Sequence, residues 1–223
     1  FTVMREPFMN LSQHISIAFT LFLTIAAPAS VANEALEAEV QAVYDSKLKE
    51  LFLYFHQNPE LSTMEHKTSA RLAEELTALG YTVHRNVGGT GIVALLENGD
   101  GPLVMFRADM DGLPVEEKSG LAYASRARQI DTNGNEVFVM HACGHDVHIT
   151  SLVGTAQLMA KKRDQWQGTL MLIGQPAEER VLGAAAMMAD NLWQRFGQPD
   201  YAMAFHVTSA MPTGMIGAST DSP

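Results

Sequence analysis

Residues 139–151, with the sequence VMHACGHDVHITS, contain three histidines, an aspartate and the only cysteine of the chain. Cys143 and His145 stand two positions apart with Gly144 between them, which places them on a loop. Thiolate and imidazole side chains are good ligands for zinc and similar first-row ions. The same residues could form a cysteine nucleophile with His145 or His141 as its base, or a polar turn that caps the next helix. The stretch by itself leaves these three interpretations open.

Two adjacent glutamates, Glu178 and Glu179 in GQPAEER, follow an apolar run that we expect to form a buried strand. One carboxylate of such a pair can bind a metal ion while the other takes a proton from a metal-activated water. Adjacent glutamates are more often a solvated pair on a helix surface. Their position just after a buried strand favours the chemical role.

Two aspartates and one further histidine extend the set of candidates. Asp109 and Asp111 in FRADMDGLP suit a turn stabilised by side-chain hydrogen bonds, and equally suit carboxylates that orient metal-binding histidines. His206 in AFHV lies on an apolar strand, where a lone histidine is usually a satisfied core residue. Beside the other motifs we interpret His206 as a ligand, because a metal site needs several neutral imidazoles.

The segments between these motifs predict alternating helices and strands. Apolar residues recur every three or four positions from Glu34 to Phe55, which predicts a helix that Asn58-Pro59 ends. Residues 62–65 have the pattern of a capping box, so we expect a second helix to begin there. We expect strands at 81–87, 92–96, 103–106, 169–173 and 201–207, and helices directly after the cysteine–histidine cluster and at 183–196.

This alternation is typical of an α/β fold with a mixed, mainly parallel sheet flanked by helices. The runs LVMF and TLMLI are apolar without alternation, as expected for strands that are covered on both faces. The candidate aspartates, glutamates and His206 all follow strands or lie near their ends. Because sites in open α/β sheets form beyond the carboxyl ends of strands, we expect these distant segments to converge on one cleft.

The overall composition limits the class of protein. The chain has 223 residues, of which 47% are hydrophobic and 18% charged, and this is the composition of a packed globular protein. A formal net charge of −10 argues against nucleic acid as a partner, because no basic stripe is present to bind phosphates. A single cysteine excludes an intramolecular disulfide.

The amino-terminal region has the features of an export signal. Residues 15–27, ISIAFTLFLTIAA, are apolar and are followed by a small-x-small site before Asn33. We expect residues 1–32 to be a signal peptide and the protein to be exported, to a periplasm or to the outside of the cell. The apolar stretch is short for a bilayer span, so no stable membrane span is expected after cleavage.

Five motifs occur in a fixed order along the chain: LYFHQNPELS, FRADMDGLP, VMHACGHDVHITSL, GQPAEE, and AFHV followed by PTGMIG. In this order they resemble the metal-dependent amidohydrolases that include hippurate hydrolases, N-acyl-amino-acid aminoacylases and auxin-conjugate hydrolases. That family belongs to the larger group of co-catalytic zinc aminoacylases and carboxypeptidases. The resemblance runs from Leu48 to Ser219 and therefore covers nearly all of the chain after the predicted signal.

The resemblance implies a role for each matching residue. Cys143 and His145 match the family's Cys-Gly-His metal ligands, Glu179 matches a further ligand, and His206 matches another. Glu178 matches the general base. The remaining matches imply supporting roles in folding or in orienting the ligands, and these residues are His56, Asp109, Asp111 and His148.

The same resemblance implies a reaction. Two divalent ions are expected, zinc or manganese, with cobalt or nickel also compatible with such ligands. They would activate a water that attacks the amide bond of an N-acyl amino acid such as hippurate or an acetyl-amino acid, and stabilise the oxyanion. Glu178 would remove the proton of that water and deliver it to the leaving amine.

Two parts of the family pattern are not found in this sequence. The family carries a further histidine ligand near its carboxyl terminus and an inserted lid and dimerisation domain. We expect residues 33–218 to be the amino-terminal part of the catalytic domain and residues 219–223 to begin the lid, with a full-length form that is a homo-oligomer through that domain. The alternatives are a metal-binding fragment without turnover and a hydrolase with Cys143 as nucleophile.

Overall fold

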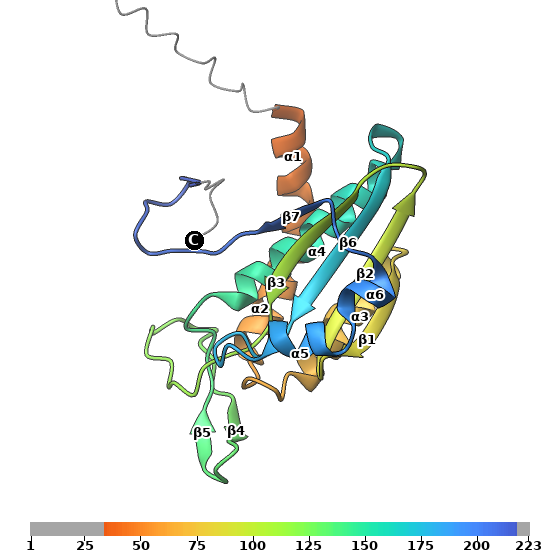
Figure 1. Ribbon diagram of the computed structural model, residues 1–223. Helices are drawn as coiled ribbons and strands as arrows, with labels where there is room; N and C mark the ends of the chain where they lie inside the picture. Colours follow the sequence, from red (N-terminus) through yellow and green to blue (C-terminus); the bar gives the residue numbers. More distant parts are fainter. Residues whose placement is uncertain (1–33, 218–223) are drawn as a thin grey trace, which may run out of the picture.

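The computed structural model describes residues 34–217 (Figure 1). The helical elements are α1 (Glu34–Val43), the π-helical turn η1 (Tyr44–Leu48), α2 (Lys49–Gln57), α3 (His66–Ala78), α4 (His145–Lys161), the 3₁₀ turn η2 (Arg163–Gln165), α5 (Gly183–Ala189) and α6 (Leu192–Phe196). The strands are β1 (Thr82–Val87), β2 (Gly91–Asn98), β3 (Leu103–Asp109), β4 (Arg128–Ile130), β5 (Glu136–Phe138), β6 (Gly168–Gln175) and β7 (Tyr201–Ala204).

The main sheet has the strand order β1-β2-β6-β3-β7 and is mixed. β1 pairs with β2 and β2 with β6 in antiparallel fashion, whereas β3 runs parallel to both β6 and β7. The predicted mixed α/β fold is therefore confirmed, with the pairings divided equally between the two orientations. The parallel part consists of β6, β3 and β7, whose carboxyl ends meet at one edge of the sheet.

Helices cover both faces of the sheet (Figure 1). The larger core lies between the sheet and α1 to α4, and it includes Phe55, Leu72, Leu152 and Leu172. The smaller core lies under α5 and α6 on the opposite face. Along β6, Leu170 and Leu172 belong to the larger core while Met171 and Ile173 belong to the smaller one. Burial on both faces explains why this strand reads as an unbroken apolar run.

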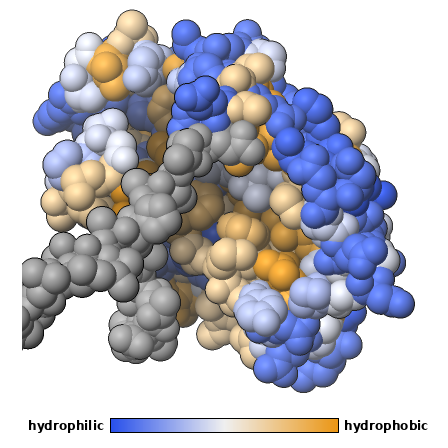
Figure 2. Space-filling model, turned by 90° about the horizontal axis from the view of Figure 1, so that it is seen from above, coloured by the Kyte–Doolittle hydropathy of each residue, from blue (hydrophilic) through white to orange (hydrophobic). Residues whose placement is uncertain are grey.

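β7 forms one edge of the sheet, and its residues are exposed. Large apolar side chains on β7 and just after it face solvent, among them Tyr201, Met203, Phe205 and Val207. Figure 2 shows hydrophobic residues gathered around a hollow in the middle of the face seen from above. An edge strand of this kind leaves backbone N–H and C=O groups available for further pairing.

The structure corrects several boundaries. The second helix begins at His66 and not at the predicted capping box, because Ser62 donates its hydroxyl hydrogen to Asp111 and Glu65 turns away from the helix start. The predicted helix at 183–196 is interrupted at Asn191, which has a positive φ of 59°. The long first helix contains the π-helical turn η1, and the hairpin of β4 and β5 was not predicted.

Within residues 34–217, none of the helices combines the length and the apolar character that crossing a bilayer requires. The predicted signal peptide (residues 1–32) and the predicted start of a lid domain (residues 219–223) lie outside the described residues. The signal peptide, export and the domain boundaries therefore stay predictions.

Candidate metal centre

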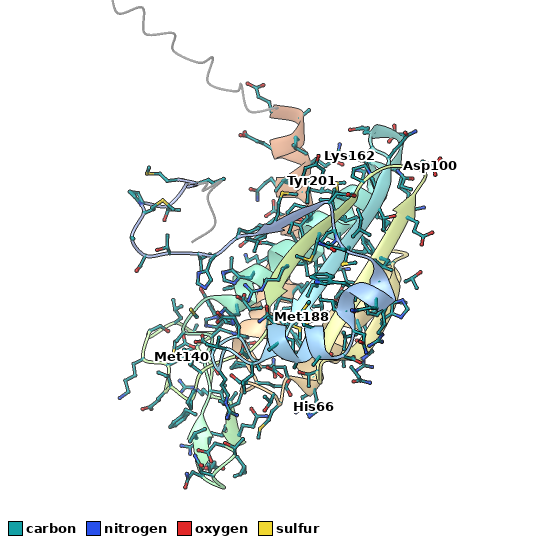
Figure 3. The ribbon with its side chains drawn as sticks, viewed as in Figure 1. His66, Asp100, Met140, Lys162, Met188 and Tyr201 are labelled. Atoms are coloured by element: carbon teal, nitrogen blue, oxygen red, sulfur yellow. The ribbon has the colours of Figure 1, made fainter. Side chains whose placement is uncertain are left out.

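The candidate residues converge at the carboxyl ends of the three parallel strands. Asp109 is the last residue of β3, the two glutamates follow β6, and His206 follows β7. α4 begins at His145 directly beneath them, after Gly144 in the left-handed conformation with a φ of 81°. Met140, which precedes the cysteine–histidine cluster, lies at this end of the sheet in Figure 3. The predicted convergence of distant segments is therefore present.

His145 is fully buried, and a backbone carbonyl group that lies beside its ring determines its tautomer. Its Nδ1 lies 2.8 Å from the carbonyl oxygen of Asp111, so Nδ1 carries the hydrogen and Nε2 carries the lone pair. That Nε2 lies 3.7 Å from a carboxylate oxygen of Asp109, 3.7 Å from Glu178 and 3.8 Å from Glu179. Each of these distances is too long for a hydrogen bond and leaves room for an ion between the groups.

Two buried polar atoms at this point have no hydrogen-bond partner among the described residues: Nε2 of His145 and Oε1 of Glu179. Buried polar atoms are nearly always paired, so an unpaired imidazole nitrogen facing an unpaired carboxylate oxygen indicates a missing ligand. The ligand atoms of Cys143, His145 and Glu179 all lie within 4.8 Å of one another. Thiolate, imidazole and carboxylate together suit zinc or a similar ion, so the residues fit the metal that the sequence predicts.

A second group of ligand atoms lies beside the first and consists of Asp109, His145, His148 and His206. His206 has Nδ1 2.6 Å from the Val207 carbonyl oxygen, which leaves its Nε2 lone pair directed at Cys143 Sγ, 3.5 Å away. His206 is thus open to a metal ion and links the two groups.

His148 differs from the other two histidines because neither of its ring nitrogens is left facing only candidate ligands. Its Nδ1 donates to Asp109 at 2.5 Å and its Nε2 accepts the backbone N–H of Val207 at 3.0 Å. This arrangement fits the predicted supporting role, in which His148 holds the carboxylate of Asp109 and the backbone just after His206. The ligand and supporting roles of these side chains stay predictions.

The two aspartates are buried and highly connected. Burial raises the pKa of Asp109, but its hydrogen bond to His148 and the charges of His145 and Arg107 outweigh burial and bring that pKa down to about 2. Burial likewise opposes ionisation of Asp111, whereas hydrogen bonds from His145 and Ser62 lower its pKa overall. Both carboxylates are therefore ionised at neutral pH and supply negative charge next to the candidate ligands.

The two glutamates of the pair occupy different environments. The Glu178 side chain is 36% exposed, whereas the Glu179 side chain is 17% exposed. Burial, together with the charges of Asp111 and Glu178, raises the pKa of Glu179. The more open glutamate is the predicted base, and the more buried one is the predicted ligand.

The environment of Cys143 opposes the thiol-nucleophile alternative. Burial, and then the carboxylates of Glu179, Glu178 and Asp109, raise the pKa of this thiol to about 11. A nucleophilic cysteine needs an electropositive setting that favours the thiolate. The surroundings of Cys143 are electronegative, so a thiolate requires a bound cation.

His141 and His56 lie outside the two groups of ligand atoms. Both ring nitrogens of buried His141 lack a partner within the described structure, and burial lowers its pKa to about 4. His141 is therefore not hydrogen-bonded to Cys143 as a base would be. His56 connects α2 to the start of α4, because its Nδ1 lies 2.7 Å from Asp146 and its Nε2 lies 3.2 Å from Glu117.

Three residues at the centre were not predicted from the sequence to belong to the site. Arg107 donates to Asp109 at 2.8 Å and to Gln175 at 3.0 Å, which fixes the end of β3 against β6. Ser62 donates to Asp111, and Glu65 accepts from the backbone just before Glu178. All three residues lie in sequence motifs, but nothing in the sequence shows which partners they have across the fold.

The sequence of this chain is similar to a known protein family and to curated relatives. Residues 105–220 match the model of peptidase family M20/M25/M40. The hippurate hydrolase of Campylobacter jejuni is 40% identical over 152 residues, which cover 68% of this chain and 37% of that protein. Thermostable carboxypeptidase 2 of Saccharolobus solfataricus is 40% identical over 165 residues, covering 72% of this chain and 39% of that protein.

A solved structure shows the same fold. The YXEP protein of Bacillus subtilis, described as a dinuclear metal binding peptidase from the M20 family, aligns with a TM-score of 0.70 at 30% identity. The alignment covers 80% of this chain and 47% of that one.

The curated relatives are longer than this chain, which spans between 37% and 48% of their length. The matched region nonetheless includes the cysteine–histidine cluster, the paired glutamates and His206. The family model covers more than half of the residues, and relatives and fold agree with it. The chain belongs to peptidase family M20/M25/M40.

Proposed function

We propose that this chain is part of a metal-dependent hydrolase that cleaves the amide bond of N-acyl amino acids such as hippurate or acetyl-amino acids. Relatives named hippurate hydrolase and N-acetyl-L-cysteine deacetylase support this substrate class. The observation that carries the proposal is the buried, unpaired pair of atoms His145 Nε2 and Glu179 Oε1, 3.8 Å apart. A divalent cation between its members would give both atoms a partner.

The residues that would hold divalent ions, zinc or manganese, are Cys143, His145, Glu179 and His206. Bound ions of this kind acidify a water and polarise the acyl carbonyl, which are the two things that amide hydrolysis needs most. Asp109 and Asp111 keep their negative charge at neutral pH and thereby favour cations at the centre.

Glu178 would act as the general base. Its carboxylate lies beside His145, with Oε2 3.7 Å from Nε2, and its side chain is partly exposed. It takes the proton of the attacking water and later delivers that proton to the leaving amine, as a general base near its substrate does. The backbone N–H of Glu178 donates to Asp111 at 3.0 Å, which holds the base in place.

Hydrolysis of hippurate and of acetyl-amino acids by the full-length protein tests this function. We expect activity to fall below detection after treatment with EDTA and to return on addition of zinc or manganese. A protein that hydrolyses these substrates equally well without metal would contradict the proposal and support the cysteine nucleophile. A full-length protein that binds metal but never turns over would support the binding-fragment alternative.

A further inference from the structure

Glu65 is a buried carboxylate that belongs to neither group of candidate metal ligands. It is fully buried just before α3, at the place where the sequence predicts the end of a capping box. Its Oε1 accepts the backbone N–H of Thr63 at 2.9 Å and the backbone N–H of Ala177 at 2.7 Å. Its Oε2 accepts the hydroxyl of Thr90 at 2.5 Å. Glu65 therefore joins three distant parts of the chain.

Ala177 is the residue directly before the predicted base, and its backbone is unusual. Its φ is 47°, in the left-handed region that alanine disfavours, and its side chain is buried. A backbone of this kind persists only where surrounding contacts hold it. The hydrogen bond to Glu65 is such a contact.

Two buried carboxylates together hold the backbone of residues 177–179. Glu65 accepts the N–H of Ala177, while the two oxygens of Asp111 accept the N–H groups of Glu178 and Glu179, each at 3.0 Å. Ser62, three residues before Glu65, donates to Asp111 as well. Residues 62–65, just before α3, therefore hold residues 177–179 in two ways. Glu65 binds Ala177 directly, and Ser62 binds the Asp111 carboxylate that accepts from Glu178 and Glu179.

We infer that Glu65 is a positioning residue for catalysis, which sets the direction of the Glu178 side chain through the backbone of Ala177. The inference rests on the proposed function, because it requires Glu178 to be the base. Glu65 touches no reacting atom. If its bond to Ala177 is lost, the left-handed backbone of Ala177 loses the contact at its N–H, and the loop is then held only from its other side, by Asp111 and by the bonds to the Ala177 carbonyl oxygen. The Glu178 carboxylate then shifts from its place beside His145.

Two substitutions of Glu65 test the inference, because one keeps the length of the side chain and the other keeps its charge. Glu65→Gln keeps the length, so its carbonyl oxygen still accepts from Ala177 and its NH₂ donates to Thr90, whose hydroxyl turns to accept. Glu65→Asp keeps the charge but is one methylene too short to reach Ala177 from the same backbone position. Thr90→Val is the matched control, because it removes a hydrogen bond to Glu65 and leaves the bond to Ala177.

The measurements are kcat, KM and metal content of the full-length, metal-loaded enzyme with hippurate, together with amide hydrogen exchange at residues 177–179. We expect Glu65→Asp to lower kcat by about 10- to 100-fold, the size that a small misplacement of a catalytic group produces. Its metal content and KM should stay near those of the unaltered enzyme, and exchange at residues 177–179 should become faster. Glu65→Gln and Thr90→Val should keep a near-normal kcat and slow exchange.

Equal kcat values for Glu65→Asp and Glu65→Gln would overturn the inference. So would an Asp variant that fails to fold beside a Gln variant with normal turnover, because Glu65 would then serve stability alone. Failure of the proposed function looks different, since the unaltered full-length protein would then show no metal-dependent hydrolysis. Amide hydrogen exchange at residues 177–179 would still show whether Glu65 restrains the backbone of these residues.

Discussion

At the scale of single residues, three histidines of the same centre differ in what they offer. His145 and His206 each have Nδ1 beside a backbone carbonyl oxygen, which puts the lone pair on Nε2, facing other candidate ligands. His148 has both nitrogens engaged, by Asp109 and by the N–H of Val207. The hydrogen-bond partner of one ring nitrogen therefore decides whether the other can bind a metal ion.

The two glutamates are expected to respond differently to the loss of charge. Glu178→Gln should retain the bound metal but lower kcat by at least about 100-fold, because general-base catalysis contributes about 10² to 10⁴ in rate. Glu179→Gln, its matched partner, should instead lower metal content. Metal analysis and kcat of the two full-length variants check this. Near-normal turnover by Glu178→Gln would show that the base has been assigned to the wrong residue.

Metal binding should release protons from the centre. The pKa of the Cys143 thiol is about 11. Burial lowers the pKa of His145, but its hydrogen bond to Asp111 and the charges of nearby carboxylates outweigh burial and raise that pKa overall. At pH 7 the thiol is protonated and must lose its proton to become a ligand. A raised pKa also makes protons stronger competitors for the His145 imidazole. Metal affinity should therefore rise with pH at every pH below the thiol pKa of about 11.

Titration calorimetry in buffers of different ionisation enthalpy measures the released protons, and we expect about one or more per bound ion. Cys143→Ser is the control and should release fewer protons, because a serine hydroxyl does not ionise in this range. Affinity that is independent of pH would contradict the assignment of Cys143 as a thiolate ligand.

At the scale of elements, the start of α4 depends on a backbone that only glycine adopts readily. Gly144 precedes His145 with a φ of 81°, and a Cβ there would lie 2.3 Å from Cγ2 of Val207, next to His206. Glycine at position 144 therefore allows the segment after β7, which carries His206, to approach the start of α4, which carries His145. The spacing Cys-Gly-His places a left-handed residue between two candidate ligands.

Gly144→Ala should lower the free energy of unfolding by more than about 1–2 kcal/mol, the cost of a left-handed non-glycine residue, because its Cβ also overlaps Val207. It should also weaken metal binding. Gly134→Ala is the matched control, since Gly134 has a φ of 84° in the β4–β5 turn and open space around it. Gly134→Ala should cost only about 1–2 kcal/mol, that of a left-handed non-glycine residue, and leave metal binding unchanged. Equal metal affinities in the two variants would argue against a role for Gly144 in the centre.

At the scale of the whole molecule, β6 is the central strand and belongs to both cores. The chain has two tryptophans, and each packs against a different core, Trp166 against the larger and Trp193 against the smaller. Because the two layers share one sheet, we expect them to unfold together as one cooperative unit.

Urea unfolding of the Trp166→Phe and Trp193→Phe variants, followed by the fluorescence of the remaining tryptophan, should give coincident midpoints. Leu172→Ala, in the middle of β6, should lower both midpoints together and cost about 2–5 kcal/mol, as loss of a fully buried leucine does. Val181→Ala is the control, because Val181 is 89% exposed. Separate midpoints for the two reporters would show that the layers unfold independently.

The sequence by itself predicted the mixed α/β fold, the order of the strands along the chain, and the candidate residues at strand ends. These follow from local properties: the period of apolar residues, the unbroken apolar runs of β3 and β6, and ordered motifs such as HACGHD. It misplaced the start of α3, because Ser62 and Glu65 bond to Asp111 and Ala177 and do not cap the helix.

Only the tertiary structure decided which polar side chains meet and what each can do. Ser62 and Glu65 are 49 and 112 residues away from their partners Asp111 and Ala177. Such pairs depend on the order and direction of the strands, which place β3, β6 and β7 side by side with their carboxyl ends together. The division of the histidines into open and engaged ones was equally invisible in the sequence. It depends on which backbone groups lie within about 3 Å of each ring, and only packing sets those distances.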